Sequence, residues 1–275
     1  FMGPNFNQKT PVSEEDKQKS YFKFYEREAA PIFPPKMGKV FGPPMNPMAA
    51  LPFAERAKIL DADYANDEIG YCAMFDGTGY VSDVNFIPGG TAEMIDWWYN
   101  WRGLDPLRYV IANPNEFIQS RTMQSAKAVD EDLTIQERYW DTTQTVIKKG
   151  VMKPAVSYLN FKYPGNVGFD MSKIGADQYT KSLICIRYYD QGQPPAAGPD
   201  TFIVHQVVEK DGGVEVRTKM WIGYTVRYGL DYKALPDEFR MTPVVPQPYL
   251  IANAVEWANV AAILPELYAA EKDNL

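Results

Sequence analysis

The sequence predicts an α+β fold in which an antiparallel sheet packs around a long C-terminal helix. Segments rich in β-branched and aromatic residues, typical of strands, recur from about residue 68 onward. Two turn-like sequences, Asp76-Gly77-Thr78-Gly79 and Lys210-Asp211-Gly212-Gly213, separate pairs of these segments as in β-hairpins. Near the C-terminus, Ile251, Val255, Ala258 and Ala262 follow a helical spacing. Many antiparallel strands followed by one long helix are typical of the α+β class.

The chain is expected to begin with a proline-rich extension, residues 1–65, packed on a main domain of residues 66–275. Six prolines between positions 31 and 47 disfavour both regular helix and central strand there. Short helices are expected at 14–27 and at 53–60, where apolar residues are available for packing.

The main domain is predicted to start with a hairpin, followed by one helix, six further strands and the C-terminal helix. Thr91 is placed to cap a helix that runs through Leu104, with Glu93 in its first turn. Pro265 is expected to bend or restart the C-terminal helix. The predicted strands and helices of this domain are strands 69–75 and 80–87, helix 91–104, strands 109–113, 142–148, 156–162 and 183–189, hairpin strands 202–209 and 214–226, and helix 248–271.

Composition limits the classes of function. The chain has 275 residues, of which 45% are hydrophobic, and this is enough for a sizeable core. A net charge of −7 and the lack of a basic run argue against a nucleic-acid partner. No apolar stretch reaches the ~20 residues needed to span a bilayer, so we expect a soluble, cytoplasmic protein without membrane contact. Cys72 and Cys185 are expected to be buried thiols, and a homo-oligomer is compatible with the sequence.

Five motifs, in matching order over roughly residues 65 to 270, carry a family resemblance. They are Gly77-Thr78-Gly79-Tyr80, Thr91-Ala92-Glu93-Met94 leading into Asp96-Trp97-Trp98, Gly103-Leu104-Asp105-Pro106-Leu107-Arg108-Tyr109, Gly212-Gly213-Val214-Glu215-Val216-Arg217 before Trp221-Ile222-Gly223, and Ile263-Leu264-Pro265-Glu266-Leu267-Tyr268. With these motifs the chain resembles the 2,4-diacetylphloroglucinol hydrolase and phloretin hydrolase family. The resemblance implies a helix-grip, START-like fold with an internal cavity. It also implies hydrolysis of a carbon–carbon bond between an acyl group and a phenolic ring, at a zinc ion held by two histidines and two glutamates.

The resemblance places the four zinc-ligand positions on Phe117, Lys148, His205 and Glu256. Only His205, the single histidine of the chain, and Glu256 keep a ligand side chain. A catalytic zinc site typically has three protein ligands, so this pair falls short. An ammonium at position 148 would also repel a dication by several kcal/mol at an effective dielectric constant of ~20. We therefore expect no metal and no other cofactor, with zinc as the alternative if Glu116, Asp141 or a carboxylated Lys148 completes a site.

Without a metal, four side chains are the candidate catalytic groups. His205 is suited to proton transfer near neutral pH, and Glu256 is expected to orient it. Lys148, if desolvated, is expected to have a lowered pKa and to donate a proton, hold an enolate or form an imine. Tyr109 matches a family tyrosine that hydrogen-bonds the substrate. Each also has a structural alternative: a hydrogen-bonded core histidine, a solvated helix glutamate, a charged strand end at Lys148, and packing for Tyr109.

The substrate pocket is expected to be lined by Phe117, Ala252, Trp221 and Tyr224. Ala252 stands where relatives commonly place another histidine, and aromatic walls suit a planar phenolic substrate. Tryptophans are nevertheless more often core residues than ligand contacts.

Three functions are compatible with these residues, and the first is the one that we expect. It is a metal-independent cyclase or isomerase in natural-product biosynthesis, acting on a hydrophobic phenolic or polyketide-like substrate, with pericyclic, Diels–Alder-type chemistry included. The second is a metal-dependent carbon–carbon hydrolase of the acylphloroglucinol type with a rebuilt site. The third is a non-catalytic protein that binds a small hydrophobic molecule.

Overall fold

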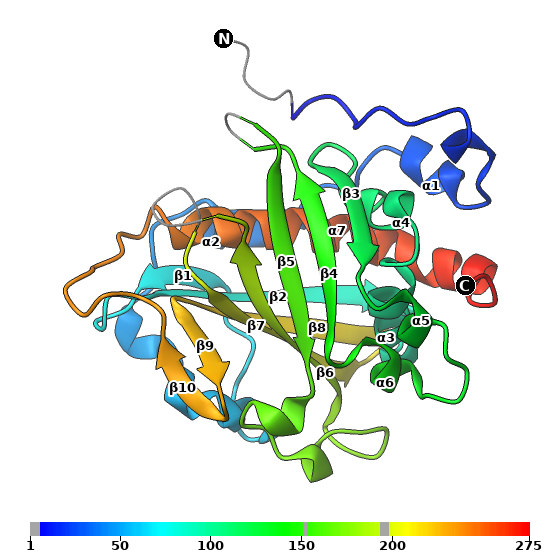
Figure 1. Cartoon of the computed structure of the whole chain (residues 1–275). Helices are drawn as coiled ribbons and strands as arrows, with labels where there is room; N and C mark the ends of the chain where they lie inside the picture. Colours follow the sequence, from blue (N-terminus) through cyan, green and yellow to red (C-terminus); the bar gives the residue numbers. More distant parts are fainter. Residues whose placement is uncertain (1–5, 151–152, 193–197) are drawn as a thin grey trace.

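The computed structural model describes residues 6–150, 153–192 and 198–275, and its centre is an eight-stranded antiparallel sheet (Figure 1). The strand order is β1-β2-β8-β7-β6-β5-β4-β3. The strands are β1 (Gly70–Ala73), β2 (Gly79–Pro88), β3 (Phe117–Thr122), β4 (Thr142–Lys148), β5 (Ala155–Lys162), β6 (Thr180–Asp190), β7 (Thr201–Lys210) and β8 (Gly213–Ile222). A small second sheet pairs β9 (Tyr224–Arg227) with β10 (Leu230–Lys233). The predicted α+β class with a large antiparallel sheet is confirmed.

Side chains alternate between the two faces of the sheet, as the period of two in a strand requires. In β7, Ile203 and Val207 belong to the core cluster on the side of the long helix, whereas Phe202 and Val204 belong to a second cluster on the opposite face. The β1–β2 turn contains Gly77 at φ +90°, where a Cβ would meet the carbonyl oxygen of Phe239 at 2.0 Å. Only glycine fits that position, and the hairpin predicted there is confirmed.

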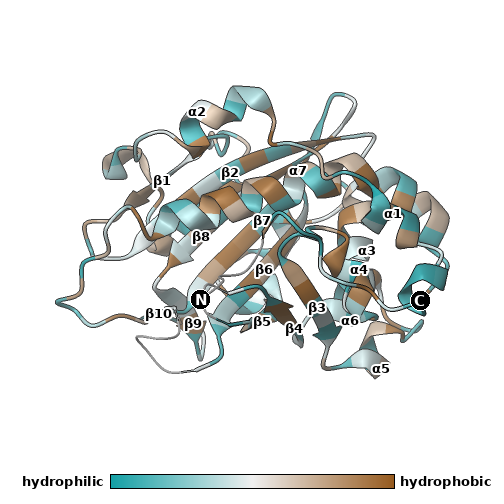
Figure 2. Cartoon of the chain, turned by 90° about the horizontal axis from the view of Figure 1, so that it is seen from above, coloured by the Kyte–Doolittle hydropathy of each residue, from teal (hydrophilic) through white to brown (hydrophobic). Residues whose placement is uncertain are grey.

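The C-terminal helix α7 (Pro246–Glu271) packs along one face of the sheet (Figures 1 and 2). It continues through Pro265, so the expectation that this proline restarts the helix is wrong. Helix α3 (Ala92–Trp101) lies beside α7 and begins as predicted, with the Thr91 hydroxyl accepting from the Met94 amide. The finer helix-grip and START-like assignment stays a prediction. In the described part of the chain no helix has the length and apolar character to cross a membrane.

The N-terminal segment wraps both faces of this core. It contains η1 (Asp16–Gln18), α1 (Phe22–Glu26), η2 (Pro34–Lys36), α2 (Met37–Val40), η3 (Pro47–Ala49) and η4 (Phe53–Leu60). The helix expected at 14–27 is therefore two shorter ones, while the one at 53–60 has the predicted bounds as a 3₁₀ helix. Phe53 of η4 packs against Phe202 and Trp221 on the face opposite α7. Residues 1–5 of the predicted extension lie outside the described residues, and its boundary at 65 stays a prediction.

Several segments differ from the predicted secondary structure, among them the strand expected at 214–226, which is divided into β8 and β9. The strand expected at 109–113 is wrong, because Asp105 caps and Pro106 starts the short helix α4 (Pro106–Val110). Strand β3 was not predicted, since Gln119, Ser120 and Arg121 give it no alternating apolar pattern. The short helices α5 (Ser125–Ala128) and α6 (Ile135–Tyr139) were not predicted either.

A buried ion pair ties the N-terminal segment to the wall of the core. The Lys36 ammonium of η2 lies 2.6 Å from the Asp83 carboxylate of β2, and the two side chains are 7% and 0% exposed. Asp83 also accepts a hydrogen bond from Asn253 of α7 at 2.9 Å. Removing one member of such a pair leaves a buried charge without compensation, which is costly.

We predict that Lys36→Met lowers the free energy of unfolding by about 3–5 kcal/mol, because the buried Asp83 carboxyl group would lose its compensating cation. Urea denaturation followed by circular dichroism measures the change. Lys39→Met, at an exposed position of the same segment, is the matched control and should change stability by less than ~0.5 kcal/mol. Equal, small effects of the two substitutions would contradict a stabilising role for the pair.

Candidate active site

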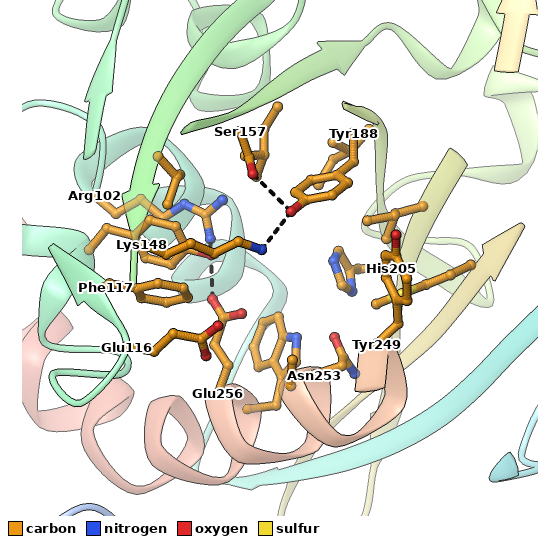
Figure 3. Close-up of a pocket in the computed structure, with 18 of the residues that line it drawn as sticks. Arg102, Glu116, Phe117, Lys148, Ser157, Tyr188, His205, Tyr249, Asn253 and Glu256 are labelled. Atoms are coloured by element: carbon orange, nitrogen blue, oxygen red, sulfur yellow. Dashed lines mark hydrogen bonds and ion pairs between the residues drawn. The ribbon is translucent and has the colours of Figure 1, made fainter. Parts of the chain in front are cut away.

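A cavity of about 290 Å³ lies between α7 and the face of the sheet that packs against it (Figure 3). Its lining comes from α3, α4, strands β3 to β8 and α7. Apolar side chains such as Val146, Leu159 and Met220 form much of the wall. The charged and titratable side chains that reach it are Arg102, Glu116, Lys148, Asp190, His205 and Glu256.

Lys148, the last residue of β4, points into this cavity and starts a chain of polar contacts (Figure 3). Its Nζ donates to the Tyr188 hydroxyl at 2.7 Å, and that hydroxyl lies 2.9 Å from the Ser157 Oγ. Ser157 in turn donates to the Asp190 carboxylate at 2.7 Å. The strand register explains the cluster, because Ser157 pairs with both Val146 of β4 and Asp190 of β6.

The surroundings of Lys148 keep it charged. Burial opposes the ammonium form, but the hydrogen bond to Tyr188 and the carboxylates of Glu116 and Asp190 outweigh it, so the pKa of Lys148 is raised above its ordinary value. The expectation that desolvation lowers this pKa is therefore wrong. A charged ammonium can stabilise a developing oxyanion or donate a proton, but it cannot form an imine without first losing a proton.

Glu256 of α7 faces Arg102, which follows the end of α3. The Arg102 Nη1 lies 3.9 Å from the Glu256 Oε1, and its guanidinium stacks over the rings of Tyr109 and Tyr99 at 4.0 and 4.3 Å. Burial raises the pKa of Glu256, while Arg102 and the Tyr109 hydroxyl partly offset this rise. The result is an oriented carboxyl group whose pKa lies nearer the range useful for general acid or base chemistry.

His205 is held by a different partner from the one predicted. Its Nδ1 lies 2.7 Å from the Thr218 hydroxyl, and its ring stacks on Tyr99 with 5.8 Å between centroids. Burial and then the charge of Arg102 lower the pKa of His205 to about 3. The imidazole is therefore neutral at physiological pH. The expected orientation by Glu256 is wrong, because Thr218 positions the ring and Glu256 pairs with Arg102.

The structure brings most of the predicted site residues together. His205, Glu256, Lys148, Tyr109, Phe117 and Ala252 all line the cavity. Glu116, considered above as a replacement metal ligand, also lines it. Trp221 and Tyr224 do not line this cavity, since both belong to the cluster on the opposite face of the sheet, where Tyr224 stacks on Phe53.

Several cavity residues were missed at the level of sequence. Tyr188 and Asp190 share a strand face with Ile186, so the alternation of β6 would have placed them toward the core. Ser157 shares a face of β5 with Leu159 and Phe161 and could have been placed by the same argument, whereas Arg102 gave no comparable signal. Asn253 was missed as well, although it lies one residue from Ala252. Its amide nitrogen is engaged by Asp83, and its oxygen points toward the cavity (Figure 3).

The side chains of the cavity do not fit the zinc site that the resemblance implies. Glu116, His205 and Glu256 line the same space, yet across the described residues no three His, Cys, Asp or Glu side chains converge as a group able to hold a metal ion. Asp141, considered as a replacement ligand, is exposed and is not part of the lining. The Lys148 ammonium adds a positive charge where a dication would need donors.

The fold and the cavity together define an α+β protein of the enzyme type, in which three carboxyl groups, a neutral imidazole and two cations line one cavity. The model of the DAPG hydrolase PhiG domain matches residues 51–269, and the chain belongs to this family. Phloretin hydrolase of Eubacterium ramulus is 36% identical over 283 residues, covering 99% of this chain and all of that protein. These matches confirm the family predicted from the five motifs.

More distant relatives share part of their length with this chain. The 2,4-diacetylphloroglucinol hydrolases of a Pseudomonas species and of Pseudomonas protegens are each 23% identical over 172 residues, covering 60% of this chain and 55% and 53% of those proteins. A solved structure, that of Ara h 8.0201, overlays with a TM-score of 0.40 at 10% identity, over 69% of this chain and 99% of that one. The named relatives are hydrolases, which supports the prediction that the chain is an enzyme.

We predict that His205 does not titrate between pH 5 and pH 8, because its pKa in the folded protein is about 3. As the only histidine, it gives a single imidazole signal in a proton NMR titration, and this signal should stay constant. The urea-unfolded chain is the control and should titrate near ~6.5. A folded-state midpoint near 6.5 would contradict the buried, neutral imidazole.

The lowered pKa of His205 in the folded protein also determines how this residue changes the free energy of unfolding with pH. Between about pH 6.5 and pH 3 the unfolded chain binds a proton at His205 that the folded chain does not bind. The contribution of His205 therefore lowers stability progressively as pH falls through this window. Above pH ~6.5 it contributes no pH dependence.

Proposed function

We propose that this protein acts on phenolic aryl ketones and cleaves the carbon–carbon bond between the acyl group and the ring. The names of the relatives support this substrate class, because phloretin and 2,4-diacetylphloroglucinol both carry an acyl group on a trihydroxylated benzene ring. The observation that carries the proposal is the placement of the Lys148 ammonium and the Glu256 carboxyl group in one cavity (Figure 3).

These two groups can divide the proton transfers of hydrolysis between them. Glu256 removes a proton from water as the water oxygen bonds to the acyl carbon. The Lys148 ammonium gives a proton to the ring carbon that bears the acyl group, as an ionised ring hydroxyl becomes a carbonyl. When the bond to the ring then breaks, its electrons pass into the ring π system and restore the phenolate. The products are the deacylated phenol and a carboxylic acid, so all atoms of substrate and water are accounted for.

The remaining polar groups have supporting roles in this scheme. Arg102 fixes the Glu256 carboxyl group, and the Tyr109 hydroxyl contacts the same carboxylate. His205 presents a neutral imidazole, able to hydrogen-bond a phenolic hydroxyl without adding charge. We propose that the reaction is independent of metal, because the donor groups of the cavity do not match a zinc site.

A second candidate is isomerisation or ring closure of the same substrate class, including a pericyclic step. The cation at Lys148 favours it, because an ammonium can hold an enolate without help from water. An enclosed apolar wall can also select one reactive conformer, and positioning of this kind contributes several kcal/mol to rate acceleration. A non-catalytic protein that binds a small hydrophobic molecule would use the same walls but would have no need for Lys148.

We predict that Lys148→Met lowers kcat/KM on phloretin and simple acylphloroglucinols by about 10²- to 10³-fold, as expected for loss of a preorganised charged donor. Mass-spectrometric analysis of the products separates the candidates: hydrolysis gives two products whose masses sum to substrate plus water, and isomerisation leaves the mass unchanged. Lys153→Met, at an exposed position nearby, is the matched control and should retain wild-type rates.

Full activity of the Lys148→Met protein would contradict the proposed role of the ammonium. Binding of the acylphenols without any product, in wild-type protein at high concentration, would instead support the non-catalytic alternative.

A further inference from the structure

We propose that Lys148, Tyr188, Ser157 and Asp190 form a proton relay that connects the cavity with the end of strand β6. This inference deepens the proposed function, on which it rests, by naming the route that restores the proton of Lys148. Three successive contacts of 2.7, 2.9 and 2.7 Å join the four side chains without a gap. All four line the cavity.

The two ends of the chain fix the direction of every hydrogen bond in it. An ammonium can only donate and an ionised carboxylate can only accept. Lys148 therefore donates to the Tyr188 oxygen, which leaves the Tyr188 hydroxyl hydrogen for Ser157 and the Ser157 hydrogen for Asp190. In this arrangement the hydrogens point from Lys148 toward Asp190. For a proton to travel back to Lys148, the Tyr188 and Ser157 hydroxyl hydrogens turn toward it, and three short transfers between the same four side chains then complete the path.

The strands hold the relay in place. Ser157 is 1% exposed and lies directly across from Asp190 in the β5–β6 register. Asp190, the last residue of β6, is partly buried, as is Lys148 at the other end of the chain. Its second oxygen accepts from the Gly198 amide at 3.4 Å. The route thus joins a partly buried cation to a partly buried carboxylate that can exchange protons with solvent.

Each catalytic cycle needs such a route. When the Lys148 ammonium gives its proton to the ring carbon, a neutral amine remains, and its environment favours the charged form. Tyr188 then passes a proton to the amine and receives one from Ser157, which receives one from Asp190 after that carboxylate has taken a proton from solvent. Glu256 meanwhile releases the proton that it took from water. One proton enters and one leaves, with no change in oxidation state.

Glu116 is the competing partner for Lys148 within the cavity, since its charge also acts on the ammonium. Its side chain accepts from Asn113 at 3.1 Å. No hydrogen bond joins Glu116 to Lys148 in the described residues. The relay through Tyr188 is therefore the hydrogen-bonded route.

The first test does not depend on catalysis. In protein labelled with ¹⁵N at lysine Nζ, NMR measures the exchange of the Lys148 ammonium hydrogens with water, and Lys148→Met assigns the signal. Ser157→Ala should slow this exchange at least tenfold, while Ser157→Thr, which keeps a hydroxyl, should restore it. Ser182→Ala is the matched control, because Ser182 is also buried on the sheet and donates to a carboxylate, that of Asp96, at 2.6 Å. Unchanged exchange in Ser157→Ala would overturn the relay.

The second test uses turnover of an acylphenol. Ser157→Ala should lower kcat by about tenfold or more with little change in KM, enlarge the solvent deuterium isotope effect, and be rescued by Ser157→Thr. Wild-type turnover with an unaffected Ser157→Ala enzyme would overturn the relay and leave the proposed function standing. Slowed ammonium exchange in a protein that converts no acylphenol would do the reverse: it would support the relay and reject the proposed function.

Discussion

The constraint on which this structure depends is that every charge between α7 and the sheet must be paired there. Taking an ion out of water costs several kcal/mol unless hydrogen bonds or opposite charges replace the water. Lys148 is therefore held by Tyr188, Arg102 faces Glu256, and Lys36 pairs with Asp83. His205 needs no opposite charge, because its imidazole stays neutral and is held by the Thr218 hydroxyl. The strand register decides which of these partners can meet.

The local and long-range parts of the fold also differ in how well they could be predicted from the sequence. The strands with β-branched residues, among them 142–148, could be predicted because burial of one face leaves an alternating pattern and burial of both leaves a continuous apolar run. The segment after Pro106 was wrong because its strand-forming residues were outweighed by a capped helix start at Asp105. Strand β3 carries no pattern of its own, because its position depends on pairing with β4.

In the site, the sequence located individual residues, but the contacts between them depend on how distant strands pack together. Family motifs located Lys148, His205, Glu256 and Tyr109, but they could not show which groups pair. Thr218 instead of Glu256 holds His205, and the raised pKa of Lys148 depends on strands β4 and β6 being brought together with β5 between them. Trp221 and Tyr224 were placed in the pocket from their size and chemistry, whereas strand parity puts them on the other face.

The chain belongs to the DAPG hydrolase family, and we propose that its cavity carries a different set of charges from the one that the resemblance implies for that family. Where the resemblance places four zinc ligands, the cavity contains an aromatic ring at Phe117 and an ammonium at Lys148. The central claim is that this set performs its chemistry without a metal ion. The zinc content of purified, untagged protein, measured by plasma mass spectrometry on samples that convert acylphenol, tests it most directly. We predict far less than one zinc per chain in active samples; close to one zinc per chain, lost together with activity on chelation, would contradict the claim.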